Sequence, residues 1–283
     1  MTERAQAYRA IRRDGVLRVD RPETEWLSSG WNGGRRRTDC AYNVSVPEGW
    51  SRTDLAAYAD ERLERADLEC LERHSQNGLR DAIEDRPPVL FTGVDLEHAR
   101  GARCGSVTVY ATAGISNPAA LPMDPDSGTL PTDSDFGSTS DGRRGGERGS
   151  EADTRPDPGT VNLVVGTTRA LADGALANLL AVAAEAKAAT LLATTGFPGT
   201  TTDAIVVGHD PAGRAAAFTG SATPVGEATR ACVRETVRAS LRSRYDGDGS
   251  IPDSVADADH GTATDVRAQV FQPALEESED RAQ

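Results

Sequence analysis

The segment from Leu171 to Thr194 constrains the fold more than any other part of the chain. It is almost entirely apolar and long enough for several helical turns, so we predict a helix over these residues. A helix that is apolar on all sides is normally buried on all sides. We therefore expect other elements to cover both of its faces.

Strand-like and helix-like segments alternate along the rest of the chain. Two further helices are predicted at residues 53–74 and 225–245. Neither half of the chain has enough elements for a core of its own. The alternation indicates an α+β (mixed α/β) fold, a single layered domain of short strands and three main helices over residues 1–245. The predicted strands, which are rich in β-branched residues, are 41–46, 105–112, 161–167, 203–208 and 214–220.

Two polar stretches stand apart from this domain. Residues 122–157 consist mostly of Gly, Pro, Ser, Thr, Asp, Glu and Arg. They cannot bury enough apolar surface to offset the entropy of ordering, so we predict a disordered insertion. Residues 246–283 are predicted to be an acidic, low-complexity C-terminal tail, in which the patch VRAQVFQPAL (266–275) could dock back.

The charge balance excludes several kinds of partner. With 31 basic and 44 acidic residues the formal charge is −13, and such a surface repels phosphate backbones and anionic membranes. We therefore expect no nucleic-acid or membrane partner. The acidic, arginine-rich composition is typical of salt-loving organisms and favours solvation at high salt. The N-terminus lacks the apolar core of a signal peptide, which predicts a cytoplasmic protein.

Cysteine and histidine are few and scattered. Cys40, Cys70, Cys104 and Cys232 form no CxxC pair, which favours reduced thiols over disulfides. The histidines show no HExxH spacing, so no metal site is predicted. His209, in GHDPAGR, is interpreted as a residue of a hairpin turn.

Small polar residues gather at the predicted strand ends, in SSGWNGGR (28–35), TAGISNP (112–118), PGTVN (158–162) and PGTTTD (198–203). Loops of this kind bind ligands in α/β proteins, although the same residues also build ordinary turns. The substrate-binding candidates are Asn32, Gly33, Gly34, Thr112, Gly114, Asn117, Asn162 and Thr202.

Lys187 is the only lysine in the chain, and the other thirty basic residues are arginine. At about 100° per residue it falls in an apolar stripe of the central helix, whereas Glu185 lies on another side. The amine could extend to the surface, or it could be desolvated and pair with a carboxylate or act as an acid/base group. The arginine bias favours the second interpretation.

Taken in order, eight stretches resemble the adenosylcobinamide amidohydrolase (CbiZ) family. They are LSSGWNGGRR, YNVSVP, VLFTGVDLEHA, VTVYATAGISNPA, PGTVNLVV, ALANLLAVAAEAKAATL, PGTTTDAIVVG and TGSATPVGEATRACV. Together they cover most of residues 26–245.

The resemblance implies a hydrolase of cobinamide salvage, which serves cobalamin biosynthesis in archaea and some bacteria. Members cleave the amide between aminopropanol and the corrin ring of adenosylcobinamide, giving adenosylcobyric acid. The partner is therefore a corrinoid small molecule whose cobalt belongs to the substrate, and no cofactor is implied. The halophile-like composition fits an archaeal source. A homo-oligomer is compatible with the sequence.

Amide hydrolysis needs a nucleophile, a donor to the oxyanion and an acid for the leaving amine. We assign Glu185 and Lys187 as the acid/base pair, although the helical phase argues against direct contact between them. Ser116 or Thr160 would be the nucleophile or oxyanion donor, and two amides, Asn117 and Asn162, would orient the substrate. The catalytic candidates are Glu185, Lys187, Ser116, Thr160 and Asp203.

Two alternatives of other classes stay open. The chain could be a corrinoid-binding module without turnover. It could also be an N-terminal-nucleophile-type amidohydrolase that acts on another amide, with Thr160 exposed by cleavage after Gly159.

Overall fold

The computed structural model describes residues 7–47, 49–50, 52–68, 70, 86–125, 159–247 and 250–273. Most of the predicted disordered insertion, residues 126–157, therefore lies outside the described residues. The same holds for residues 274–283 at the end of the predicted tail.

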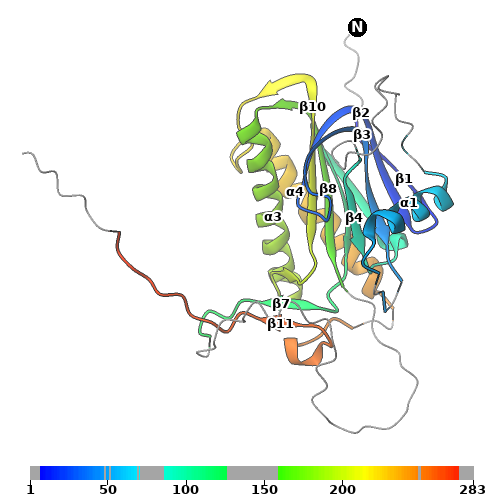
Figure 1. The fold of residues 1–283 in the computed structure, drawn as a ribbon. Coiled ribbons are helices and arrows are strands. Elements are labelled where there is room, and N and C mark those ends of the chain that lie inside the picture. Colours follow the sequence, from blue (N-terminus) through cyan, green and yellow to red (C-terminus); the bar gives the residue numbers. More distant parts are fainter. Residues whose placement is uncertain are drawn as a thin grey trace, which may run out of the picture.

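Short strands and three main helices make up the described residues, which confirms the α+β class (Figure 1). The helices are α1 (Leu55–Ala66), α3 (Asp173–Thr195) and α4 (Pro224–Tyr245), with single turns η2 (Leu96–His98) and η3 (Val255–Asp257). The strands are β1 (Arg9–Arg13), β2 (Val16–Ser28), β3 (Gly34–Ser45), β4 (Val89–Thr92), β5 (Arg100–Cys104), β6 (Val107–Ala113), β7 (Pro118–Ala120), β8 (Val161–Leu171), β9 (Gly199–Thr200), β10 (Ala204–Ala216) and β11 (Thr262–Ala263).

Eight strands form one sheet in the order β4-β3-β2-β10-β8-β6-β5, with β1 paired to β2. Strands β8 and β10 are parallel, and Asn162 at the start of one lies opposite Ala204 at the start of the other. Strand β6 runs antiparallel to β8 and ends there, with Ala113 opposite Val161. The loops that precede β8 and β10 and the loop that follows β6 therefore meet at one edge of the sheet.

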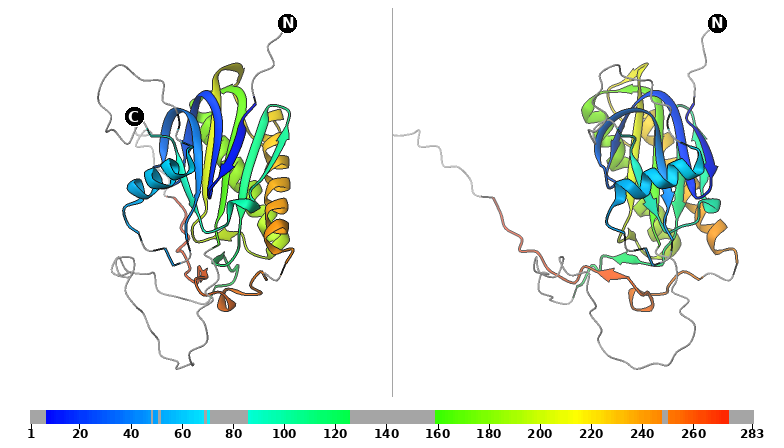
Figure 2. Two further views of the ribbon diagram at one scale, coloured as in Figure 1. Left: turned by 90° about the vertical axis from the view of Figure 1, so that its right-hand side faces the viewer. Right: turned by 45° about the vertical axis from the view of Figure 1, so that its right-hand side comes forward.

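The elements are layered, and α3 and α4 lie on the opposite side of the strands from α1 (Figure 1, Figure 2). Leu163 of β8 packs in the core cluster that contains α3 and α4, whereas the next residue, Val164, belongs with Leu17 of β2 to a second cluster. A third cluster joins Tyr42 of β3 to Tyr58 of α1. The alternation of side chains along each strand thus separates three cores.

The apolar segment predicted to be a central helix becomes α3, which packs against β10 and α4. The expectation that both of its faces are covered is wrong, because one side is exposed and includes Leu192. It ends at Gly196, whose backbone is left-handed (φ 81°) and whose N–H donates to the carbonyl of Leu192 at 3.1 Å. By length and composition alone α3 is also apolar enough to cross a membrane. Because one of its faces packs on the sheet and buries an ion pair, we interpret it as the core helix of a layered domain.

Two predicted elements differ from the observed ones. The helix predicted over 53–74 ends at Ala66, because Asp67 adopts a left-handed conformation (φ 49°) that stops it; residues 71–74 lie outside the described residues. The separate strand predicted over 214–220 is wrong, because residues 214–216 are the end of β10 and residues 217–220 belong to no strand.

The interpretation of His209 as a turn residue is also wrong. His209 is buried in β10, opposite Thr167 of β8. Its Nδ1 accepts a hydrogen bond from the N–H of Leu171 at 3.0 Å, and its Nε2 lies 3.4 Å from a carboxylate oxygen of Glu25. Burial lowers the pKa of His209 from its ordinary value of 6.5.

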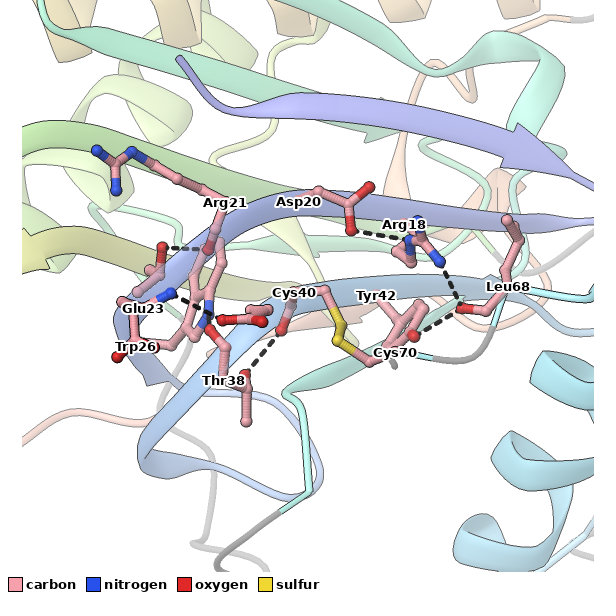
Figure 3. Close-up of a disulfide and its surroundings, with 12 residues drawn as sticks. Arg18, Asp20, Arg21, Glu23, Trp26, Thr38, Cys40, Tyr42, Leu68 and Cys70 are labelled. Atoms are coloured by element: carbon pink, nitrogen blue, oxygen red, sulfur yellow. Dashed lines mark hydrogen bonds and ion pairs between the residues drawn. A yellow bond between two sulfur atoms is a disulfide. The ribbon is translucent and has the colours of Figure 1, made fainter. Parts of the chain in front are cut away.

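The expectation of four reduced thiols is wrong for one pair, because Cys40 of β3 and Cys70 form a disulfide (Figure 3). The segment before Cys70 is also tied to this layer, since the carbonyl of Leu68 accepts from the hydroxyl of Tyr42 at 2.7 Å. Cys104 and Cys232 are free. Sequence spacing gave no sign of the pair, because the two cysteines meet only after α1 packs on β3.

Part of the predicted tail joins the fold. Strand β11 pairs with β7, which in turn pairs with β9, so residues 262–263 complete a small three-stranded sheet near the start of β10. Within the patch that could dock back, Val270 and Phe271 are exposed.

Candidate active site

Lys187 forms an ion pair with Asp203. The lysine comes from the buried face of α3 and the aspartate from the turn between β9 and β10. Their side chains are only 11% and 10% exposed, so the amine does not extend to the surface. Of the two interpretations of Lys187, the structure shows a desolvated amine that pairs with a carboxylate.

Asp203 has three further donors. One oxygen, Oδ1, accepts from the N–H of Val161 at 2.8 Å and from the hydroxyl of Thr200, and Oδ2 also accepts from the N–H of Thr200 at 3.1 Å. A Cβ on Gly199 would lie 2.8 Å from Oδ2, so glycine leaves the space that the carboxylate occupies. Asp203 therefore joins α3, β9 and the start of β8 in one bonded unit.

Hydroxyl and amide groups surround this unit. Thr160 Oγ1 lies 2.8 Å from Thr202 Oγ1. The amide nitrogen of Asn117 donates to Thr201 Oγ1 at 2.6 Å and, more weakly, to Thr202 Oγ1 at 3.4 Å. The amide oxygen of Asn117 is buried and has no partner among the described residues. An unpaired buried acceptor is costly, which marks Asn117 as a place where a ligand N–H could bind.

Three side chains, from β3, β6 and β8 of the large sheet, form a second polar network. Asn162 Nδ2 donates to Asn43 Oδ1 at 3.0 Å and to the carbonyl of Phe91 at 2.8 Å, while Asn162 Oδ1 accepts from the N–H of Ala204 at 3.1 Å. Asn43 Nδ2 in turn donates to Thr112 Oγ1 at 2.9 Å. Asn162 therefore positions the starts of β8 and β10.

Asn43 was missed from the sequence. The one signal was its place as an amide inside the otherwise apolar strand segment AYNVSV, where a buried polar group must find partners.

The loop after β6 packs directly on the start of β8. The N–H of Gly114 donates to the carbonyl of Thr160 at 3.2 Å. A Cβ on Gly159 would lie 2.3 Å from the backbone nitrogen of Ser116. The structure thus brings Gly114 and Ser116 to the side of the Thr160 cluster.

Asn32, Gly33 and Gly34 lie outside this cluster, at the tip of the β2–β3 hairpin. Asn32 Nδ2 donates to the carbonyl of Pro87 at 2.9 Å, and its Oδ1 accepts from the N–H of Val89 at 3.0 Å. Gly34 has a left-handed backbone (φ 94°). In the structure these three residues shape and anchor the turn.

Glu185 is not brought to Lys187. Its side chain is 63% exposed, and a carboxylate oxygen lies 3.7 Å from Arg230 of α4. The divergence expected from helical phase is therefore confirmed, and Asp203 is the carboxylate that Lys187 meets.

A groove of 660 Å³ opens between α3 and α4. Ala186 and Thr190 of α3 line it together with Arg230, Arg234 and Arg238 of α4. Neither member of the Lys187–Asp203 pair does, so the groove and the polar cluster are separate features. Among the described residues no group of three or more His, Cys, Asp and Glu side chains could hold a metal ion.

Known proteins resemble this chain along most of its length. A family model described as adenosylcobinamide amidohydrolase matches residues 1–248. A relative named adenosylcobinamide amidohydrolase from Halobacterium salinarum is 56% identical over 260 residues, which is 92% of this chain and 97% of the relative. One of the same name from Methanosarcina mazei is 24% identical over 230 residues, covering 78% and 91%.

Among solved structures, the PH0078 protein from Pyrococcus horikoshii OT3 matches with a TM-score of 0.41 at 12% identity, covering 82% of this chain and 78% of that chain.

Proposed function

The chain belongs to the adenosylcobinamide amidohydrolase family, and on that premise we propose that its reaction takes place at the cluster around Asp203. The chain hydrolyses the amide between aminopropanol and the corrin ring of adenosylcobinamide. Water supplies OH to the carbonyl carbon and H to the nitrogen, so the products are adenosylcobyric acid and aminopropanol. The cobalt enters with the substrate and leaves in the adenosylcobyric acid.

We infer that Asp203, and not Glu185, is the partner of Lys187 in the acid/base pair. The ion pair is desolvated and fixed by four donors to one carboxylate, and a desolvated group of this kind is suited to moving a proton. Glu185 is exposed and paired with Arg230, which leaves it no contact with the cluster.

Thr160 is the nucleophile in this proposal, since its hydroxyl is within hydrogen-bond distance of Thr202 and the next residue donates its N–H to Asp203. The oxygen of Thr160 attacks the amide carbon while its proton passes to the Lys187–Asp203 pair. That proton then goes to the leaving amine, and water hydrolyses the resulting ester. Asn117 orients the substrate by accepting its N–H at the unpaired amide oxygen.

The observation that carries this proposal is the convergence of an ion pair, a hydroxyl pair and an unpaired buried amide oxygen at one sheet edge. The test is release of aminopropanol from adenosylcobinamide at high salt by the wild-type chain and by Thr160→Ala and Thr160→Ser. We expect release by the wild type, none by the alanine variant and partial release by the serine variant. Wild-type activity in Thr160→Ala would reject Thr160 and direct attention to Ser116 or a bound water.

The two alternatives are tested with the same protein. Tight corrinoid binding without amine release would indicate a binding module. An N-terminal-nucleophile enzyme is a competing proposal because the hydroxyl of Thr160 already lies in the cluster. Such an enzyme would appear as two fragments in an intact mass spectrum, cut after Gly159, whereas our proposal requires one chain. We further propose a cytoplasmic location, which cell fractionation would test.

A further inference from the structure

Trp31 stands exposed at the tip of the β2–β3 hairpin, where 41% of its surface is accessible. The glycines beside it have no side chain, which lets the tip pack closely against the rest of the chain. A Cβ on Gly30 would lie 2.6 Å from a methyl of Leu90, and one on Gly33 would lie 2.8 Å from the carbonyl of Ser28. The motif GWNGG therefore builds a tight turn that leaves a large aromatic side chain in solvent.

The tip is fixed relative to the candidate active site. The N–H of Ser29 donates to the carbonyl of Ile205 at 2.9 Å, and the N–H of Ile205 returns a bond to Ser29 Oγ at 3.0 Å. Ile205 follows Asp203 by two residues in the chain. On the other side Asn32 anchors the tip to the segment before β4. Trp31 is thus held in place before any ligand arrives, which reduces the entropic cost of binding.

Trp31 is one end of an aromatic cluster. Its ring centroid lies 5.8 Å from that of Phe91, which lies 5.5 Å from Trp50, and Trp50 lies 5.2 Å from Tyr58. Two of the three tryptophans of the chain meet here. The indole nitrogen of Trp50 is buried and has no partner among the described residues, so the cluster also contains an unused hydrogen-bond donor.

This cluster adjoins the polar network directly. The carbonyl of Phe91 accepts from the side chain of Asn162, the residue that positions the starts of β8 and β10. A ligand that lies on Trp31 and Phe91 is therefore next to the sheet edge at which we place the chemistry.

We propose that Trp31 is a stacking platform for the adenine of the cobalt-bound adenosyl group, with the ring of Phe91, tilted by 50° to the indole, as the wall beside it. The inference rests on the proposed function, which supplies the ligand. Aromatic side chains bind nucleobases by stacking on their flat faces. One exposed indole matches a bicyclic purine in size. The corrin ring carries amide chains and methyl groups around its rim, which hold it away from a flat ring.

The experiment uses reaction products, because these carry the same macrocycle and are not turned over. Dissociation constants for adenosylcobyric acid and cyanocobyric acid are measured by calorimetry at high salt for the wild type, Trp31→Ala and Trp31→Phe. We expect the wild type to bind the adenosyl form about 10- to 100-fold more tightly than the cyano form. Trp31→Ala removes that preference and leaves cyanocobyric acid binding unchanged, while Trp31→Phe keeps most of it.

Phe218→Ala serves as the matched control, since Phe218 is another exposed aromatic residue, remote in sequence from the tip and in none of its aromatic contacts. It should leave both constants unchanged. The proposal is overturned if Trp31→Ala keeps the adenosyl preference, if it weakens both ligands equally, or if the wild type shows no preference or binds neither acid. Aminopropanol release in the same preparation reports separately on the proposed function.

Discussion

Lys187 and Asp203 neutralise each other in a place that water hardly reaches. Each side chain is about nine-tenths buried, and each comes from a different element, α3 and the turn before β10. Removing one member of a buried pair leaves the other charge uncompensated, which costs far more than the pair itself contributes. The pair therefore links the stability of the domain to the geometry of its candidate active site.

Lys187→Met is expected to abolish aminopropanol release and to lower the free energy of unfolding by about 3–5 kcal/mol. The methionine fills similar space but leaves Asp203 without its cation. Lys187→Arg keeps the charge and so separates ion pairing from proton transfer, because a guanidinium is bulkier and stays protonated. We expect this variant to fold and to be inactive, as measured by thermal unfolding and amine release. Full activity in Lys187→Arg would reduce the lysine to a generic cation.

Gly199→Ala should weaken the Lys187–Asp203 ion pair although neither partner is replaced. The new Cβ would lie 2.8 Å from Asp203 Oδ2 and 3.7 Å from Lys187 Nζ, so the carboxylate must shift. We expect a lower melting temperature and at least a tenfold loss of kcat. Gly174→Ala is the matched control, because nothing lies within 4 Å of its Cβ position in the first turn of α3. It should be neutral or stabilising by up to about 1 kcal/mol. Equal behaviour of the two variants would contradict the steric argument.

Asn117 and Asn162 should respond differently to removal of their side chains. Every polar atom of the Asn162 amide is bonded within the chain in a buried place, so Asn162→Ala should destabilise by about 2–3 kcal/mol. Asn117 has an unpaired oxygen, so Asn117→Ala should cost less stability and instead reduce kcat/KM by roughly 10-fold or more. Urea unfolding and amine-release kinetics on both variants give the comparison. A larger stability loss for Asn117→Ala would argue for a purely structural role.

The sequence predicted four of the strands and all three helices, but it missed the strands rich in charged residues and also the short apolar strand β4 (VLFT). Strands β3, β6, β8 and β10 and all three helices were predicted. Strand β1 reads RAIRR and β5 reads RGARC, so neither shows the apolar alternation on which strand prediction depends. Their pairing with β2 and β6 comes from long-range hydrogen bonds that a local pattern cannot reveal.

The sequence predicted most residues of the candidate site but not which of them contact one another. The angular positions of residues around the predicted helix placed Lys187 in the core and Glu185 on another side, and both features are observed. That Asp203 is the partner follows only from the packing of α3 beside the turn before β10. Asn43 contributes from β3, whose place over β8 depends on the bending of the sheet. The loop residue Asn32 matched a ligand-binding pattern, yet its amide is used to anchor a turn.

His209 makes stability depend on pH below neutrality. Burial lowers its folded-state pKa below the ordinary 6.5, and Nδ1 accepts the Leu171 N–H, which a protonated ring cannot do. Below pH 6.5 the unfolded chain therefore binds more protons than the folded chain. The contribution of His209 is complete above pH 6.5 and is lost as pH falls through the lowered folded-state pKa.

The measurement for His209 is the melting temperature between pH 8 and pH 5 at constant high salt. The neighbouring charged groups are Glu25, Arg35 and Asp210. His209→Asn retains an acceptor near the position of Nδ1 and does not titrate. We expect its melting temperature to fall less steeply with decreasing pH than that of the wild type. Parallel profiles for the two proteins would exclude His209 as the source.

Reduction of the Cys40–Cys70 disulfide should destabilise the α1 layer and spare the chemistry. The bond closes a loop of 30 residues, and the loss of such a constraint raises the entropy of the unfolded chain by an amount worth about 3–4 kcal/mol. For a domain of this size that corresponds to a fall of roughly 10 °C in melting temperature. Activity at a low assay temperature should persist, because Cys40 belongs to the core cluster of the α1 layer, whereas Asn43 of the same strand bonds to Asn162 on the other face.

Cys40→Ser should lower the melting temperature as a reductant does in the wild type, and adding a reductant to this variant should have no further effect. Cys104→Ser, at an exposed free thiol, should change nothing. An unchanged melting temperature in Cys40→Ser would mean that the two thiols are not joined in solution.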